Sequence, residues 1–236
     1  MSAEPPPSDP YAAAAALGLR TAGLFHDLRS AFNVVGGCAE LMARSDDRGE
    51  RVEYLEEVWR QLDAVTAMAN EVMAFARGEQ TVFPRKVYMN RFLDQMAGTL
   101  HDKLAGSGIA LRFDAQYLGV AWFDEPKILR VIDNLVRNAT EAMSGAGDLR
   151  ISTRADEGSL YLELADTGPG IPEDVAPRLF EPFVTSKHTG TGLGLSICKT
   201  IVTEHAGEIS FHSGRDQGTT FVVRLPLSGT GHPPSG

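Results

Sequence analysis

The chain has 236 residues, of which 43% are hydrophobic, and its formal net charge is −9 with a pI near 5.2. This composition is ordinary for a folded protein of one large or two modest domains. The acidic balance argues against a general nucleic-acid or anionic-membrane binder, because phosphate groups attract clustered Lys and Arg. Proteins and small ligands are the expected partners.

Cysteine usage and hydropathy limit the class of protein further. Cys38 and Cys198 lie far apart, without His or Cys neighbours at metal-ligand spacing, so neither a zinc site nor a disulfide framework is predicted. No run approaches the roughly 20 apolar residues of a membrane span, and the Ala-rich stretch 12–17 follows an acidic, proline-rich segment. We expect a cytoplasmic protein without a membrane span.

The two ends are rich in Pro, Gly and Ser, so residues 1–10 and 228–236 are predicted to be disordered tails. Between them we expect a helical domain over 11–79, a linker over 80–85 that includes Pro84, and a mixed domain over 86–227.

The helical domain has apolar residues at heptad spacing in two stretches that contain no proline. The first stretch has Phe25, Leu28, Phe32, Val35, Ala39 and Met42, and the second has Leu55, Val58, Leu62, Val65, Ala69, Val72 and Ala76. The polar segment 45–50 between them predicts a turn, and hence an antiparallel helical hairpin. Because one hairpin cannot enclose its own heptad face, we expect a homodimeric four-helix bundle.

The second domain alternates short strand-like runs with amphipathic helices. Residues 149–153, 160–166 and 220–227 have the alternation or apolar content of strands. The fold class is therefore predicted as α+β, a helical hairpin followed by an α/β sandwich.

Three segments of this domain are candidates for a nucleotide site. Asn134 and Asn138 lie one turn apart on the predicted helix 133–143, where amide oxygens suit Mg²⁺. Asp166 ends a strand and precedes two glycines, Gly168 and Gly170, so a flat ring could approach while the carboxylate accepts its amine. Taken singly, solvated amides and an ordinary turn explain each of these segments.

The third segment, 190–202, has glycines at alternate positions immediately before a predicted helix. Such a loop presents backbone N–H groups and a helix dipole to phosphate. We expect this loop to bind the cofactor through Gly190, Gly192, Leu193, Gly194 and Leu195. Lys187, three residues before Gly190, is expected to add a positive charge. The order of the three segments is more specific than any one of them.

These segments resemble four motifs of sensor histidine kinases. DNLVRNATEAM resembles the N box, DTGPGIP the G1 box, LFEPFVTSK the F box and GTGLGLSI the G2 box. Within this family, the nitrogen-regulation branch is the most similar. The resemblance covers about 86–227 and implies the Bergerat ATP-binding fold, shared with gyrase, a mismatch-repair ATPase and a heat-shock chaperone. It implies that Asp166 recognises adenine and that Asn138, with Asn134, holds Mg²⁺. Gly192 and Gly194 would border the triphosphate of ATP, and Lys187 would touch its γ-phosphate.

The segment 25–42 is similar to the H box of the same family, which implies that His26 is the phosphoacceptor. His26 follows a heptad position and so points outward, and Asp27 can accept its Nδ1 proton. The family commonly has Asn or Thr, then Pro, where this chain has Ser30 and Ala31. We therefore expect weak phosphatase activity, with Ser30 as the remaining hydroxyl.

The predicted function is an ATP-dependent histidine kinase that phosphorylates itself on His26 and passes the phosphoryl group to an aspartate of a response-regulator receiver domain. Input would come from a separate sensory protein or an upstream sensor domain. Two alternatives remain. One is a non-catalytic phosphotransferase or pseudokinase docking module, and the other is a Bergerat-type ATPase or serine kinase without histidine chemistry.

Overall fold

The computed structural model describes residues 28–76, 82–185, 192–215 and 217–228. Residues 28–76 form one compact unit, and the described residues from 82 onward form a second. Among the helices of the described ranges, none combines the length and apolar composition that a membrane crossing requires. The predicted α+β class is confirmed.

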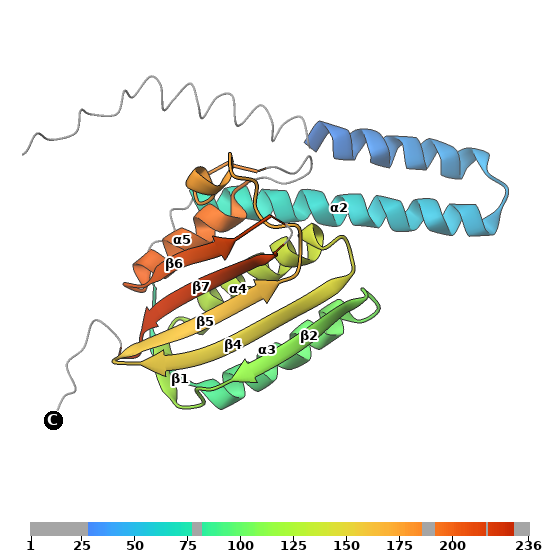
Figure 1. Ribbon diagram of the computed structural model, residues 1–236. Helices are drawn as coiled ribbons and strands as arrows, with labels where there is room; N and C mark the ends of the chain where they lie inside the picture. The colour runs from blue at the N-terminus through green and yellow to red at the C-terminus, as the bar shows by residue number, and fades with distance from the viewer. Residues whose placement is uncertain (1–27, 77–81, 186–191, 216, 229–236) are drawn as a thin grey trace, which may run out of the picture. The chain divides into compact units, whose positions relative to one another are not determined.

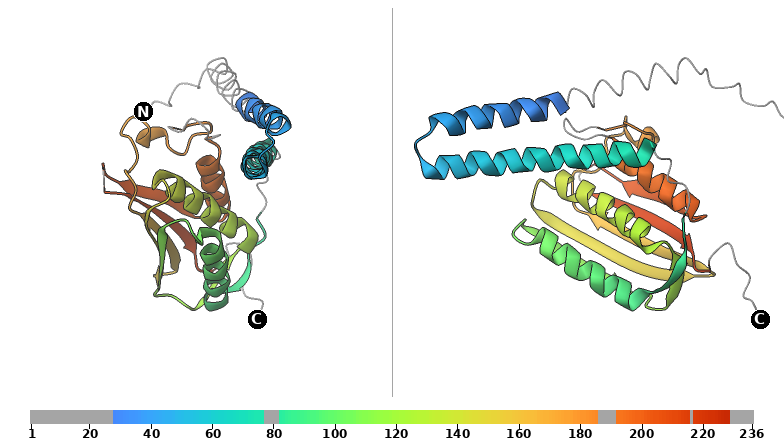
Figure 2. Two further views of the ribbon diagram at one scale, coloured as in Figure 1. Left: turned by 90° about the vertical axis from the view of Figure 1, so that its right-hand side faces the viewer. Right: turned by 180° about the vertical axis from the view of Figure 1, so that it is seen from behind.

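The first unit is an antiparallel helical hairpin (Figures 1 and 2). Residues 28–44 are helical, and α2 spans Arg48–Ala76. Asp47 ends the turn, since its Oδ1 accepts from the backbone N–H groups of Gly49 at 2.6 Å and Glu50 at 3.3 Å. Satisfying the first N–H groups in this way sets where α2 begins.

The second unit contains a five-stranded sheet of order β2-β4-β5-β7-β6, in which β2 and β4 are parallel and the other pairs are antiparallel. Its strands are β2 (Ile109–Ala115), β4 (Gly147–Asp156), β5 (Ser159–Asp166), β6 (Glu208–Ser213) and β7 (Thr219–Pro226). A separate antiparallel ribbon pairs β1 (Arg85–Tyr88) with β3 (Val120–Phe123). The three strand-like runs of the sequence are thus β4, β5 and β7.

Three helices cover one face of the sheet, as Figure 2 shows edge-on: α3 (Met89–Leu104), α4 (Glu125–Ala142) and α5 (Gly194–Glu204). A 3₁₀ turn, η1 (Ala176–Arg178), lies in the connection before α5. The core forms between helices and sheet because apolar side chains recur at helical spacing on α4, such as Ile128, Val131 and Leu135, and alternate along β5.

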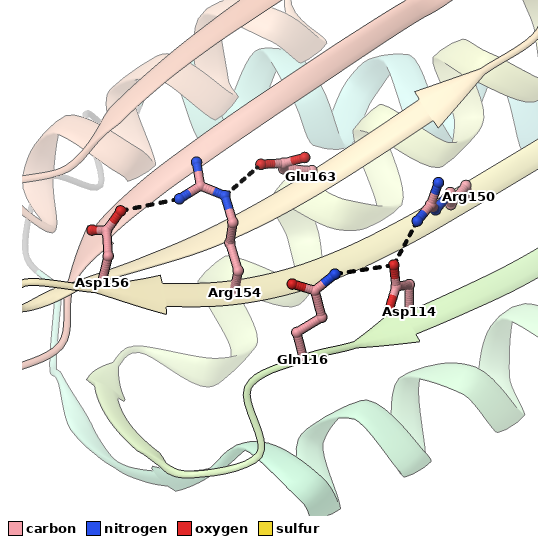
Figure 3. A network of polar contacts seen from close by, with 6 residues as sticks. All are labelled: Asp114, Gln116, Arg150, Arg154, Asp156 and Glu163. Carbon is pink, nitrogen blue, oxygen red and sulfur yellow. Dashed lines mark hydrogen bonds and ion pairs between the residues drawn. The ribbon is translucent and has the colours of Figure 1, made fainter.

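The opposite face of the sheet is polar, and its charged side chains form ion pairs between neighbouring strands and, for Arg154 with Asp156, along β4 (Figure 3). Arg154 contacts Glu163 and Asp156, and Arg150 contacts Asp114. These pairs are partly or fully exposed, so each contributes little to folding stability. Buried polar side chains with a functional role are therefore expected on the helix-covered face of the sheet.

Candidate functional site

Asp166 is the last residue of β5 and points toward the helices. In β5 every second side chain is buried, and Asp166 continues the inward series after Leu160, Leu162 and Leu164. Strand alternation thus brings a carboxylate into the apolar layer with 8% of its surface exposed. The prediction that an acidic residue ends a strand here is confirmed.

The carboxylate of Asp166 is fixed by backbone donors. Its Oδ1 accepts from the N–H groups of Gly168 at 2.9 Å and Thr219 at 3.3 Å. Burial raises the pKa of the Asp166 carboxyl, and these two hydrogen bonds oppose that rise. Because both bonds end on Oδ1, neither uses Oδ2, which is suited to accept a hydrogen bond from a ligand amine.

The glycines after Asp166 are required by close backbone contacts. A Cβ on Gly168 would stand 2.9 Å from Asp166 Oδ1. Gly170 has φ +83°, and a Cβ there would collide with the carbonyl oxygen of Gly214. The turn 166–172 therefore packs too tightly for side chains at these two positions.

Helix α4 places the two asparagines as predicted, one turn apart. Asp124 caps this helix, with its side chain accepting from the N–H of Lys127. Asn134 is buried, with 9% exposed, and Asn138 is half-buried. The Oδ1 of Asn134 accepts from Arg137 Nη2 at 3.2 Å, whereas its Nδ2 is buried without a hydrogen-bond partner in the described structure.

Residues 192–194 lead directly into α5. Gly192 has φ +65°, its carbonyl accepts from the N–H of Phe183 at 2.9 Å, and a Cβ there would stand 2.5 Å from the Phe183 backbone. Leu193 is fully buried and Leu195 half-buried, so these leucines anchor the loop to the core. The first turn of α5 thereby presents its N–H groups at a fixed place.

Gly194 brings the start of α5 beside α4. If Gly194 carried a Cβ, that atom would lie 3.5 Å from Arg137 Nη2 and 3.7 Å from Asn134 Oδ1. A cation, a buried amide and a helix N-terminus therefore meet within a few ångströms. All three features favour an anionic ligand.

Other predicted site residues lie elsewhere or outside the described ranges. Ser30 is exposed on the helix 28–44. His26, Asp27, Lys187 and Gly190 lie outside the described residues.

The structure adds three residues that the sequence motifs did not single out. Thr219 is brought to Asp166 by the pairing of β5 with β7, a register that no local pattern indicates. Phe183, with φ +63°, holds the glycine loop through its backbone. Arg137 could have been noticed, because it lies three residues after Asn134 on the same helix.

The geometry fits Mg-ATP. Among the described residues no group of three or more His, Cys, Asp or Glu side chains is arranged to hold a metal ion. Magnesium needs few protein ligands when phosphate oxygens and water complete its shell, so a carboxamide oxygen on α4 is sufficient. The Nδ2 of Asn134, which has no hydrogen-bond partner in the described structure, is a donor suited to a polar ligand, and the Oδ2 of Asp166 is a suitable acceptor.

Comparison with known proteins agrees with this geometry. Residues 123–229 match the family described as histidine kinase-, DNA gyrase B-, and HSP90-like ATPase. The catalytic domain of the histidine kinase ThkA is 30% identical, with a TM-score of 0.56, and the match covers 61% of this chain and 96% of that one. The chain belongs to the sensor histidine kinase family. Its second unit is a Bergerat-type ATPase domain.

Two curated relatives match most of this sensor histidine kinase, across both of its units. The C4-dicarboxylate transport sensor protein DctB of Rhizobium meliloti is 35% identical over 218 residues, which are 89% of this chain and 35% of that protein. Sporulation kinase A of Bacillus subtilis is 29% identical over 213 residues, which are 89% of this chain and 34% of that protein. The chain thus spans about a third of the length of these relatives.

Proposed function

We propose that this sensor histidine kinase binds Mg-ATP in its second unit, phosphorylates itself on His26, and passes the phosphoryl group to an aspartate of a response-regulator receiver domain. The observation with most weight is the buried carboxylate of Asp166, held through Oδ1 with Oδ2 left for the exocyclic amine of adenine. Membership of the sensor kinase family supports the choice of acceptor and partner.

The proposed chemistry is phosphoryl transfer by positioning and charge neutralisation. The Nε2 of His26 attacks the γ-phosphorus, an N–P bond forms, and the bond to the β,γ-bridging oxygen breaks as ADP leaves. As Nε2 bonds to phosphorus, the imidazole ring gains positive charge and its Nδ1–H becomes more acidic, so Asp27 accepts that proton. The carboxamide of Asn138 would hold Mg²⁺, which would neutralise phosphate charge, and the first turn of α5 would bind the phosphates.

A homodimer is proposed because the hairpin leaves apolar surface open. Ala31 and Cys38 are buried within the single chain, whereas Phe32 is 58% exposed, Leu55 44% and Trp59 60%. Phe32 and Leu55 belong to the heptad series predicted to face a second hairpin. Covering large apolar side chains is the main driving force for such association.

The decisive experiment is incubation with γ-labelled ATP. The kinase proposal requires acid-labile, base-stable label on wild type and none on His26→Gln, with the variant still binding ATP. Binding without any label would favour the phosphotransferase or pseudokinase alternative. Acid-stable label on Ser or Thr would indicate a serine kinase instead.

Dephosphorylation of the receiver is proposed to be weak. Ser30 is exposed and offers a hydroxyl in place of the amide or threonine that the family commonly has. Rapid, ADP-dependent loss of phosphate from a phosphorylated receiver, absent with Ser30→Ala, would contradict this.

A further inference from the structure

The carboxamide of Asn134 lies where α4 meets the N-terminus of α5. It has 9% of its surface exposed, and its Oδ1 is 3.2 Å from Arg137 Nη2. The same oxygen is 3.7 Å from the position of a Cβ on Gly194, the first residue of α5. Asn134 therefore faces the place where the glycine loop enters its helix.

The orientation of this amide is decided by its neighbour. A guanidinium has donors only, so the atom of Asn134 that faces Arg137 must be the oxygen. The NH₂ group then points away from Arg137, and its nitrogen is buried without a partner in the described structure. Buried amide N–H groups are almost always paired, so an unpaired one at a helix N-terminus indicates a place for a ligand oxygen.

We propose that Arg137 is a positioning residue, which holds Asn134 so that its NH₂ donates to a phosphate oxygen of the bound nucleotide. This inference rests on the proposed function. It separates the roles of the two asparagines, which the sequence motif groups together as metal ligands. Asn138 remains the magnesium ligand, and Asn134 contacts the phosphate directly.

The reverse orientation is unfavourable. If Asn134 turned its oxygen toward a metal, its NH₂ would face the guanidinium, and two donors would oppose each other. The positive end of the α5 dipole and the charge of Arg137 also favour an anion over a cation at this point.

The test compares Asn134→Asp with Asn138→Asp, two identical chemical changes one helical turn apart. Binding of a non-hydrolysable ATP analogue is measured by calorimetry in excess Mg²⁺ and in EDTA. Aspartate keeps an oxygen ligand but cannot donate. We expect Asn134→Asp to bind about tenfold to a hundredfold more weakly than wild type in both buffers, the value of one hydrogen bond to a charged group. For Asn138→Asp, Mg²⁺ should relieve the defect seen in EDTA.

If Mg²⁺ restores binding to Asn134→Asp as it does to Asn138→Asp, Asn134 is a metal ligand and the inference is wrong. The inference is also wrong if Asn134→Asp binds the ATP analogue as tightly as wild type does in EDTA. A wild-type protein that binds no nucleotide in either buffer would instead refute the proposed function. Thermal melting of each variant without ligand shows whether it is folded.

Arg137 is tested by Arg137→Ala and Arg137→Lys. Lysine still donates to the Asn134 oxygen and so should restore a large part of the affinity that alanine loses, in both buffers. Combining Arg137→Ala with Asn134→Asp should add little further loss, because both changes remove the same contact. Fully additive losses would show that Arg137 does not act through Asn134.

Discussion

The Nε2 of His205 accepts a hydrogen bond from the backbone N–H of Asp124 at 2.9 Å, which joins the end of α5 to the start of α4. The Nδ1 of the same ring lies 2.7 Å from the carbonyl oxygen of Ile201. One ring nitrogen accepts and the other donates, so the buried imidazole is neutral. The two helices that border the proposed phosphate site are thus fixed to each other at their far ends.

This neutral histidine predicts a pH-dependent stability. Burial lowers the pKa of His205 below its ordinary value of about 6.5. Between the lowered pKa and the unfolded value, the unfolded chain binds more protons, so the free energy of unfolding falls as pH decreases through this range. Urea unfolding from about pH 8 to about pH 5 should show the decline. His205→Gln should flatten it, and an unchanged slope in the variant would rule out His205 as its source.

Asp124 should be a stability hot spot. Its carboxylate caps α4 and also accepts from the N–H of Phe83 at 3.0 Å. Asp124→Ala removes both bonds, and we expect a loss of about 1–2 kcal/mol in the free energy of unfolding. Asp114→Ala is the control, because Asp114 contacts Arg150 and Gln116 on the open face (Figure 3). Its unfolding midpoint should not change measurably.

Asp166→Asn should separate binding from folding. The amide keeps Oδ1 as acceptor for the two backbone N–H groups, but it places an NH₂ where the adenine amine donates in the proposed complex. We expect ATP binding to be lost. Since the pKa of Asp166 is raised, its charge opposes folding at neutral pH, so the variant should melt at the same or a higher temperature. A lower melting temperature would mean that the negative charge stabilises the fold.

Gly192→Ala should distort residues 192–194, which we propose to border the phosphates of ATP. The residue has φ +65°, and its Cβ would overlap the Phe183 backbone. Backbone strain of about 1–3 kcal/mol should weaken ATP affinity by about fivefold to about 150-fold. Gly98→Ala in α3 is the matched control, because a Cβ there meets nothing within 4 Å. That change should raise stability by about 0.5–1 kcal/mol and leave ATP affinity unchanged.

The amino-acid sequence by itself determined the local features of this protein. Helix α4 with its two asparagines, the strand that ends at Asp166, and the glycines before α5 all follow from periodicity and backbone freedom, which act over a few residues. Their order along the chain also determined the family. The heptad series in 28–76 likewise indicated the hairpin.

Only the tertiary structure decided which residues from distant parts of the chain contact each other. Thr219 reaches Asp166 through strand pairing, His205 reaches Asp124 from another helix, and Gly194 reaches Asn134 through helix packing. Each of these contacts joins residues more than fifty positions apart, and its geometry depends on sheet register and helix packing. Local patterns contain no information on either, because both are set when the apolar faces of separate elements are buried together.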